Sequence, residues 1–311
     1  MLDPKQSIES SVLPISVIVP AHQQWEALVK TLLIIGECRP APSEVLVHVD
    51  GGNSLILHNL SQQFQELTVL TSNALQGPGG SRNLLVAAAR HEWVANFDDD
   101  SFPAHRDYFG RIAALIERFP ETAVFSAASH AAEWQRMSVD RVGIFSGCGC
   151  VFRKSMFEAL GGFVPLPVAY GMEEVDLSLR IHDAGGVILH DPLLRVRHEP
   201  PERRRDDDQI SAAVLANTFL LPWLRYPWLL MGIGLLQGLS RLRWMLARGQ
   251  WRAVGRGIAM TPGHLAGHSA ERRAVSTLSL LSWLKLRRHP EARIEARAFP
   301  AGWKEDSTWT P

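Results

Sequence analysis

Residues 93–101 read WVANFDDDS, a short apolar run followed at once by three carboxylates, Asp98, Asp99 and Asp100. The run is typical of a buried strand, and the acids come where that strand ends. Side chains alternate along an extended chain, so Asp98 and Asp100 are expected on one side and Asp99 on the other. Two converging carboxylates repel each other unless a cation lies between them, and Mg²⁺ or Mn²⁺ suits oxygen ligands. The alternative interpretation is a solvated acidic turn.

Strand and helix patterns alternate on both sides of this stretch. Apolar runs predict strands over residues 15–20, 44–49, 68–71, 93–97, 123–127, 147–153, 187–190 and 195–198. Helical spacing predicts helices over residues 25–35, 81–90, 154–160 and 173–184, with a loop at 77–80. This alternation predicts an α/β fold with a mostly parallel central sheet, in which ligands bind beyond the carboxyl ends of the strands. Asp50 follows the second strand and shares that edge with the triplet, which favours the cation site over the turn.

The sequence GMEEVDLSLR, residues 171–180, opens a predicted helix with three acids in its first turn. The helix dipole favours acids there, and Asp176 and Arg180 have the spacing of a surface ion pair, so a purely structural role is one interpretation. Glu174, however, shares a stripe with Leu177, which predicts that it faces inward beside a cavity. A carboxylate in that position suits a general base that acts on a substrate hydroxyl.

Seven motifs in chain order resemble the family 2 inverting glycosyltransferases, which have a GT-A fold. They are ISVIVPA (15–21), EVLVHVDGGN (44–53), GSRN (80–83), FDDDS (97–101), GGF (161–163), GMEEVDLSLR (171–180) and VRH (196–198). The resemblance implies a nucleotide-diphosphate sugar donor, a hydroxyl-bearing acceptor, and Mg²⁺ or Mn²⁺ as cofactor. It also implies a single displacement that inverts the configuration of the anomeric carbon.

The resemblance further implies which residues form the site. The residues that would contact the donor nucleotide are Pro20, Ala21, His22, Asp50, Arg82, Asp98 and Asp99. The implied metal ligands are Asp98, Asp100 and His198, although an ordinary loop histidine is the alternative for the last. Glu174 stands where the family usually has its catalytic aspartate, and the choice between Glu174 and Glu173 stays open. Val49 is a second departure, because the family commonly has an acid at that position.

The net charge of zero, from 32 Lys and Arg against 32 Asp and Glu, conceals a segregation along the 311 residues. Residues 209–290 hold eleven Lys and Arg and one acid, and seven of the 10 tryptophans lie from Trp223 onward. Arginines and tryptophans beside apolar stripes fit a helix that lies in the interface of an anionic membrane. The alternatives are a helical appendage that packs on the catalytic domain and a membrane-spanning segment, although the uninterrupted run Trp228–Leu236 is short for spanning.

These observations predict a GT-A domain over residues 12–205, a basic Trp-rich helical region over 206–290 and a tail over 291–311. The polar N-terminus and the three unpaired cysteines predict a cytoplasmic enzyme, or one bound peripherally to the inner face of the cytoplasmic membrane. The composition excludes disordered, collagen-like and disulfide-scaffold proteins, and no nucleic-acid-binding motif accompanies the bases. Alternative functions are a sugar nucleotidyltransferase and a non-catalytic, membrane-peripheral protein that binds sugar nucleotides.

Overall fold

The strand before the acidic triplet lies inside a ten-stranded sheet in the computed structural model, which describes residues 12–52, 54–64, 66–130, 132–168, 171–199 and 208–295. The main path is β10-β7-β9-β6-β8-β4-β1-β2-β3, and β5 pairs with β9. The strands are β1 Val12–Ala21, β2 Ala41–Asp50, β3 Thr68–Ser72, β4 Trp93–Asn96, β5 Ser101–Pro103, β6 Thr122–Ala128, β7 Ser138–Arg141, β8 Val151–Arg153, β9 Val187–His198 and β10 Glu291–Glu295. Parallel pairs join β1 to β2 and β4, β2 to β3, and β6 to β9, which confirms the predicted α/β fold.

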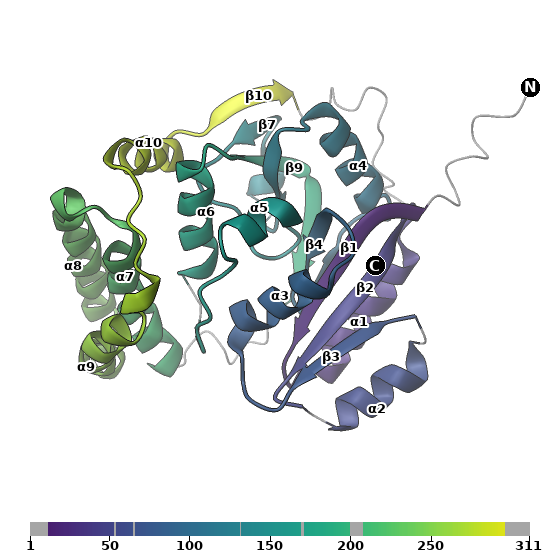
Figure 1. The fold of residues 1–311 in the computed structure, drawn as a ribbon, viewed down its shortest axis with the longest axis horizontal. Coiled ribbons are helices and arrows are strands. Elements are labelled where there is room, and N and C mark those ends of the chain that lie inside the picture. Colours follow the sequence, from purple (N-terminus) through teal and green to yellow (C-terminus); the bar gives the residue numbers. More distant parts are fainter. Residues whose placement is uncertain are drawn as a thin grey trace, which may run out of the picture.

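Helices cover both faces of the sheet (Figure 1). They are α1 Trp25–Glu37, α2 Ser54–Gln63, α3 Gly77–Ala88, α4 Tyr108–Arg118, α5 Lys154–Ala159, α6 Glu173–Asp183, α7 Asp208–Arg225, α8 Met231–Ala247, α9 Trp251–Gly267 and α10 Thr277–Arg288. On one face, Leu28 of α1 and Phe109 of α4 belong to the same buried cluster as Val17 of β1. On the other face, Leu177 of α6 is clustered with Val94 of β4. The two apolar layers hold the strand ends, and therefore the acidic residues, in fixed positions.

Three local predictions differ from the structure. Residues 77–80, predicted as a loop, form the first turn of α3, where Pro78 is tolerated because it has no N–H to leave unpaired. The two short strands predicted over 187–198 are one strand, β9, whose pairing with β6 shifts register between Asp191 and Arg195. The strand predicted over 147–153 is shorter, because β8 begins at Val151. Asn53, Tyr170 and the predicted domain boundary at 205 lie outside the described residues.

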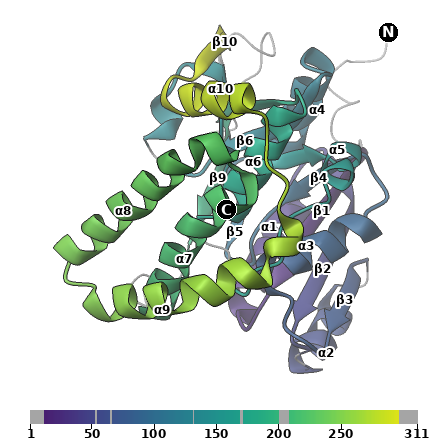
Figure 2. The same cartoon turned by 60° about the vertical axis from the view of Figure 1, so that its left-hand side comes forward.

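The C-terminal helices α7 to α10 lie on the side of the molecule where α6 is found (Figure 2). Trp283 of α10 and Leu220 of α7 share a buried cluster with Leu179 of α6, so the C-terminal helices are packed on α6. An ion cluster joins α6 to α7, because Asp176 of α6 binds Arg180 of the same helix and Arg225 of α7. The predicted pair of Asp176 and Arg180 is therefore present but buried, instead of lying on the surface.

Candidate active site

The carboxyl edge of the sheet brings Asp98, Asp100 and His198 together. β5 pairs antiparallel with β9, which places Ser101 opposite His198 and so brings the end of β9 beside the triplet. Nε2 of His198 lies 3.2 Å from Oδ1 of Asp100. One potential ligand atom from each of the three residues lies within 4.8 Å of the others. Two carboxylates and an imidazole form a donor set that fits Mn²⁺ or Mg²⁺.

The third acid of the triplet has a different role from its neighbours. The carboxylate of Asp99 accepts hydrogen bonds from the backbone N–H of His22 at 3.1 Å and from Nε2 of Gln24 at 3.0 Å. Asp99 and Asp100 form a turn, so the side chains separate because of turn geometry and not by the strand alternation that the sequence suggested. Asp99 therefore holds the loop from His22 to Gln24 that follows β1. It is not one of the three potential metal ligands.

Arg82 of α3 is a buried link between two parts of the site. Its Nη2 donates to Asp98 at 2.6 Å, and its Nη1 donates to Glu173 at 2.6 Å. Its Nε donates to the side chain of Asn96 at 3.2 Å. Burial alone would lower the pKa of Arg82, but the carboxylates of Asp98 and Glu173 raise it, so the guanidinium stays charged. Although the resemblance placed Arg82 beside the donor diphosphate, its donors bind protein groups here.

The two glutamates at the start of α6 have different surroundings. Glu173 is 1% exposed and lies against Gly79, where an added Cβ would collide with its carboxylate. Glu174 is half-buried and its carboxylate lies against Gly147, where an added Cβ would also collide. Burial raises the pKa of Glu173 to about 8 and also raises the pKa of Glu174, while Arg82 opposes both shifts. Of the two glutamates, Glu173 forms the ion pair with Arg82 and Glu174 does not.

Asp50 is used differently from the contact that the resemblance implied. Its carboxylate accepts the backbone N–H of Gln76 at 2.8 Å and of Gly77 at 3.0 Å, and the hydroxyl of Ser72 donates to it at 3.2 Å. It therefore binds the N-terminal end of α3, where backbone donors lack partners within the helix. His22 lies next to it, with Nδ1 at 3.3 Å from the carbonyl oxygen of Asp50. Asp50 thereby fixes the start of the helix that carries Arg82.

One residue of the site, Asn96, was not identified from the sequence. The side chain of Asn96 donates to the carbonyl oxygen of Gly147 at 2.6 Å and accepts from Arg82. Asn96 thus connects the backbone at Gly147, against which Glu174 lies, to the side chain of Arg82. A polar residue within the buried run WVANF was the available signal, because buried polar side chains require partners.

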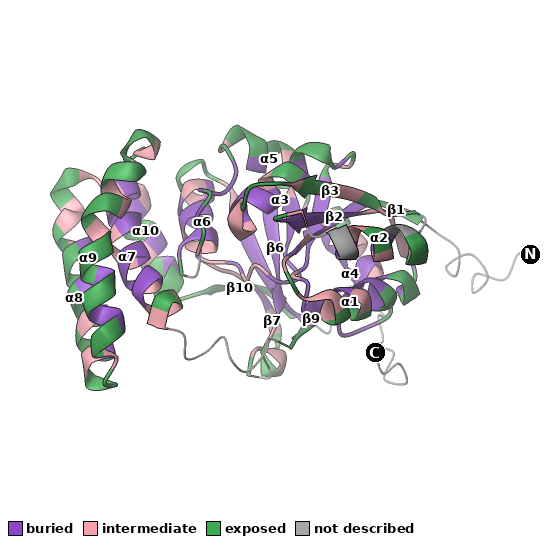
Figure 3. Cartoon of the chain, turned by 90° about the horizontal axis from the view of Figure 1, so that it is seen from below, coloured by how far each residue is buried: buried purple, intermediate pink, exposed green. Residues whose placement is uncertain are grey.

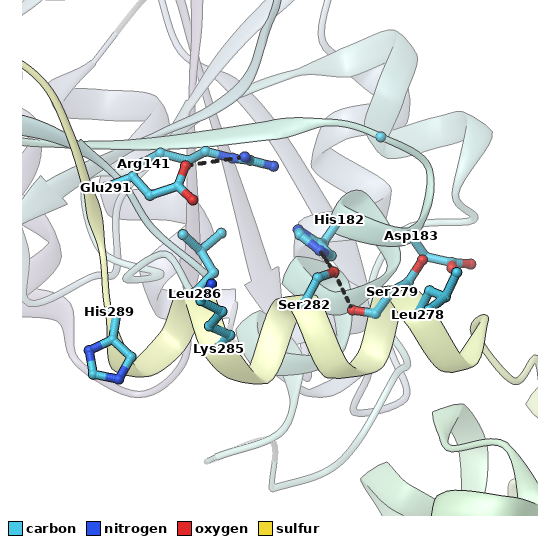
Figure 4. A pocket seen from close by; sticks show the side chains of 11 residues that line it. Arg141, His182, Asp183, Leu278, Ser279, Ser282, Lys285, Leu286, His289 and Glu291 are labelled. Atoms are coloured by element: carbon cyan, nitrogen blue, oxygen red, sulfur yellow. Dashed lines mark hydrogen bonds and ion pairs between the residues drawn. The ribbon is translucent and has the colours of Figure 1, made fainter.

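Two pockets border the C-terminal elements. One, of about 640 Å³, lies between α6 and α10 (Figure 4). It contains the hydrogen-bonded pair of His182 and Ser282, and none of the predicted site residues lines it. The other, of about 390 Å³, includes Ser126, Ser146 and the buried His190. It adjoins the site, because Ser146 directly precedes Gly147.

The buried carboxyl of Glu173 predicts a pH dependence of stability. Its pKa rises from an ordinary 4.5 to about 8 in the folded protein, so over that window the folded state holds a proton that the unfolded state has lost. Stability contributed by this group should therefore be fully present below pH 4.5 and should fall as pH rises, by about 1.4 kcal/mol per pH unit. Urea unfolding across the window should give a flatter profile for Glu173→Gln. The exposed control Glu117→Gln should keep the wild-type profile, and equal profiles for both variants would contradict the prediction.

Comparisons with known proteins identify the class and then the family. The fold is the one seen in solved glycosyltransferases. The model of Glycosyl transferase family 2 matches residues 16–141, so this segment, which carries Asp50, Arg82 and the Asp98–Asp100 triplet, belongs to that family. The predicted membership of glycosyltransferase family 2 is thus confirmed over this segment. No curated protein sequence matches the chain.

Solved structures share the fold at low sequence identity. The mannosyltransferase PcManGT from Pyrobaculum calidifontis, in complex with GDP-Man and Mn²⁺, is 16% identical with a TM-score of 0.55, and the match covers 89% of this chain and 87% of that one. TarS 1–349 from S. aureus, in complex with UDP-GlcNAc, is 12% identical with a TM-score of 0.53, covering 81% and 92%. GalNAc-T7 with UDP, GalNAc and Mn²⁺ is 15% identical with a TM-score of 0.54, covering 72% of this chain and 49% of that one.

Proposed function

We propose that the protein transfers a sugar from a nucleotide-diphosphate sugar to an acceptor hydroxyl, with inversion at the anomeric carbon. The observation that carries the proposal is the placement of Glu174 against Gly147, whose carbonyl oxygen accepts a hydrogen bond from Asn96, two residues before the first member of the Asp98, Asp100 and His198 group. The neighbours that bind GDP-Man, UDP or UDP-GlcNAc support a sugar-nucleotide donor.

The donor side of the proposed reaction rests on the acidic group. Asp98, Asp100 and His198 would hold Mn²⁺ or Mg²⁺, and the bound cation would neutralise charge on the leaving diphosphate. Asp99 and Asp50 support the site through backbone hydrogen bonds. Asp99 holds the loop at His22, and Asp50 holds the start of α3. In this proposal they position the groups that meet the nucleotide.

The acceptor side of the proposed reaction rests on Glu174. Its carboxylate removes the proton of the acceptor hydroxyl as that oxygen attacks the anomeric carbon. The bond between the anomeric carbon and the diphosphate oxygen breaks, and the diphosphate leaves with the electron pair. The pocket beside Ser146 is lined by hydroxyls, His190, Glu133 and Arg136, groups that bind a polar, hydroxyl-rich acceptor such as a glycan. The acceptor would be a glycan, a lipid-linked sugar or a small molecule, in glycan, glycolipid or cell-envelope biosynthesis.

Metal removal tests the donor side. In thermal unfolding with a panel of UDP-, GDP- and dTDP-sugars, one donor at about 100 times its Kd should add about 2.7 kcal/mol of stability with Mn²⁺ present. EDTA should remove most of this gain, and so should His198→Ala. The exposed control His289→Ala should retain it. Undiminished stabilisation in EDTA would contradict the metal site, and retention of configuration in the product, followed by NMR, would contradict the single displacement.

A further inference from the structure

Exposed apolar side chains lie along α8 and along the short 3₁₀ helix that precedes it. Its members, which we name the α8 apolar face, are Trp228, Leu229, Leu235, Leu236 and Leu239, exposed by 66%, 83%, 56%, 67% and 49%. Trp228 and Leu229 belong to the short 3₁₀ helix Trp228–Leu230, and the others belong to α8. Within α8, Leu235 and Leu236 precede Leu239 by four and three residues, which places these three leucines along one side of the helix. Soluble monomers seldom expose contiguous apolar surface of this kind without a function.

The opposite side of α8 packs against α7, which fixes the outward direction of the apolar face. Gly234 and Gly238 lie so close to Pro222 and Phe219 of α7 that an added Cβ would collide with either side chain. The leucines therefore point away from the protein. Figure 3 shows α8 and α9 at one end of the molecule, outside α7.

The charge around this face has one sign. Helices α8 and α9 contain no acidic residue, and the arginines in them and in the turn between them are Arg241, Arg243, Arg248, Arg252 and Arg256. The guanidinium of Arg248 lies 3.9 Å from the ring centre of Trp244, and Trp251 at the start of α9 is 66% exposed. Exposed tryptophans and leucines beside arginines are the composition of helices that lie in a membrane interface.

We infer that the α8 apolar face and the surrounding arginines bind the surface of an anionic lipid bilayer. The leucines and Trp228 would enter the acyl boundary, while Arg243 and Arg252 contact lipid phosphates. Among the described helices, none combines the length and apolarity needed to cross a bilayer, so the contact would be peripheral. A second copy of the chain is the disfavoured occupant, because two such faces would bring like charges together.

Vesicle flotation tests the inference, which goes beyond the proposed transfer reaction and does not depend on it. Wild type should float with vesicles of equal parts phosphatidylglycerol and phosphatidylcholine, remain soluble with phosphatidylcholine alone, and lose binding as salt is raised. The Glu174→Gln variant should float like wild type, which separates a failure here from a failure of the proposed activity.

Matched variants locate the binding surface. Leu236→Glu should weaken binding roughly tenfold or more, because about 1.5–3 kcal/mol of leucine burial is lost. Leu33→Glu, at a leucine of α1 that is 55% exposed, should have no effect. Arg243→Gln with Arg252→Gln should weaken binding roughly thirtyfold at about 1 kcal/mol per base, and Arg106→Gln with Arg118→Gln should not.

Three outcomes would overturn the inference. They are wild type that stays soluble with anionic vesicles, Leu236→Glu that floats undiminished, and a concentration-dependent dimer in analytical ultracentrifugation that Leu236→Glu abolishes while no flotation occurs. The last result would assign the face to contact between copies. Because Leu236 is exposed, circular dichroism should show wild-type folding for the variant.

Discussion

Glu174→Gln should bind the sugar nucleotide as wild type does and transfer the sugar about 10²–10⁴ times more slowly. The substitution keeps the shape of the side chain beside Gly147 but removes its ability to accept a proton. Donor affinity, from calorimetry with Mn²⁺, and single-turnover rates would measure the two effects separately. A near-wild-type rate would remove Glu174 from the role of base.

The neighbouring glutamate provides the matched control. Glu173 is paired with Arg82 and faces α3, so Glu173→Gln should reduce turnover far less than Glu174→Gln. The pH profile gives a second test: because burial raises the pKa of Glu174, wild-type turnover should fall as pH is lowered through that raised value, where the base becomes protonated. A larger loss in Glu173→Gln would reverse the assignment of the base.

Much of the catalytic domain could be predicted because its pattern is strong over short distances. The β-branched run in β1 and the spacing in α1 and α6 each fixed an element near its observed bounds. Local chemistry misled at α3, where Gly-Pro-Gly-Gly suggested a loop. That turn is helical because the Asp50 carboxylate, 27 residues before Gly77, binds its backbone N–H, a contact that no local pattern indicates.

The sequence indicated which acidic residues lie at the site, but it did not indicate which side chains they contact. The motifs indicated Asp98, Asp100 and His198, and the pairing of β5 with β9 brings them together. The bond from Arg82 to Glu173 joins residues 91 positions apart, through the packing of α3 beside α6. Such contacts depend on how whole elements pack, so a single sequence places the residue types and leaves their partners open.

Arg82→Met should reduce the free energy of unfolding by about 3–5 kcal/mol at pH 8.5, because it leaves two carboxylates of the site without their cation. The guanidinium is 5% exposed and binds Asp98 and Glu173 at 2.6 Å each. Methionine fills a similar volume without charge, so the loss reports on the ion pairs more than on packing. Urea unfolding followed by tryptophan fluorescence would measure it.

The double variant Arg82→Met with Glu173→Gln separates the contribution of the Arg82–Glu173 ion pair to stability from that of the other Arg82 contacts. If the unpaired Glu173 carboxylate causes most of the loss, the double variant should be more stable than Arg82→Met alone by about 1–3 kcal/mol at the same pH. The difference should shrink at pH 6. Burial raises the pKa of Glu173 and Arg82 opposes that rise, so without Arg82 the carboxyl is protonated in the folded state, and protonating it costs less free energy at the lower pH. Arg82→Lys should recover only part of the stability. The ammonium keeps the positive charge, but it cannot bind two carboxylates in the planar geometry of a guanidinium. Additive losses in the double variant at both pH values would show that Arg82 and Glu173 act independently and would contradict the prediction.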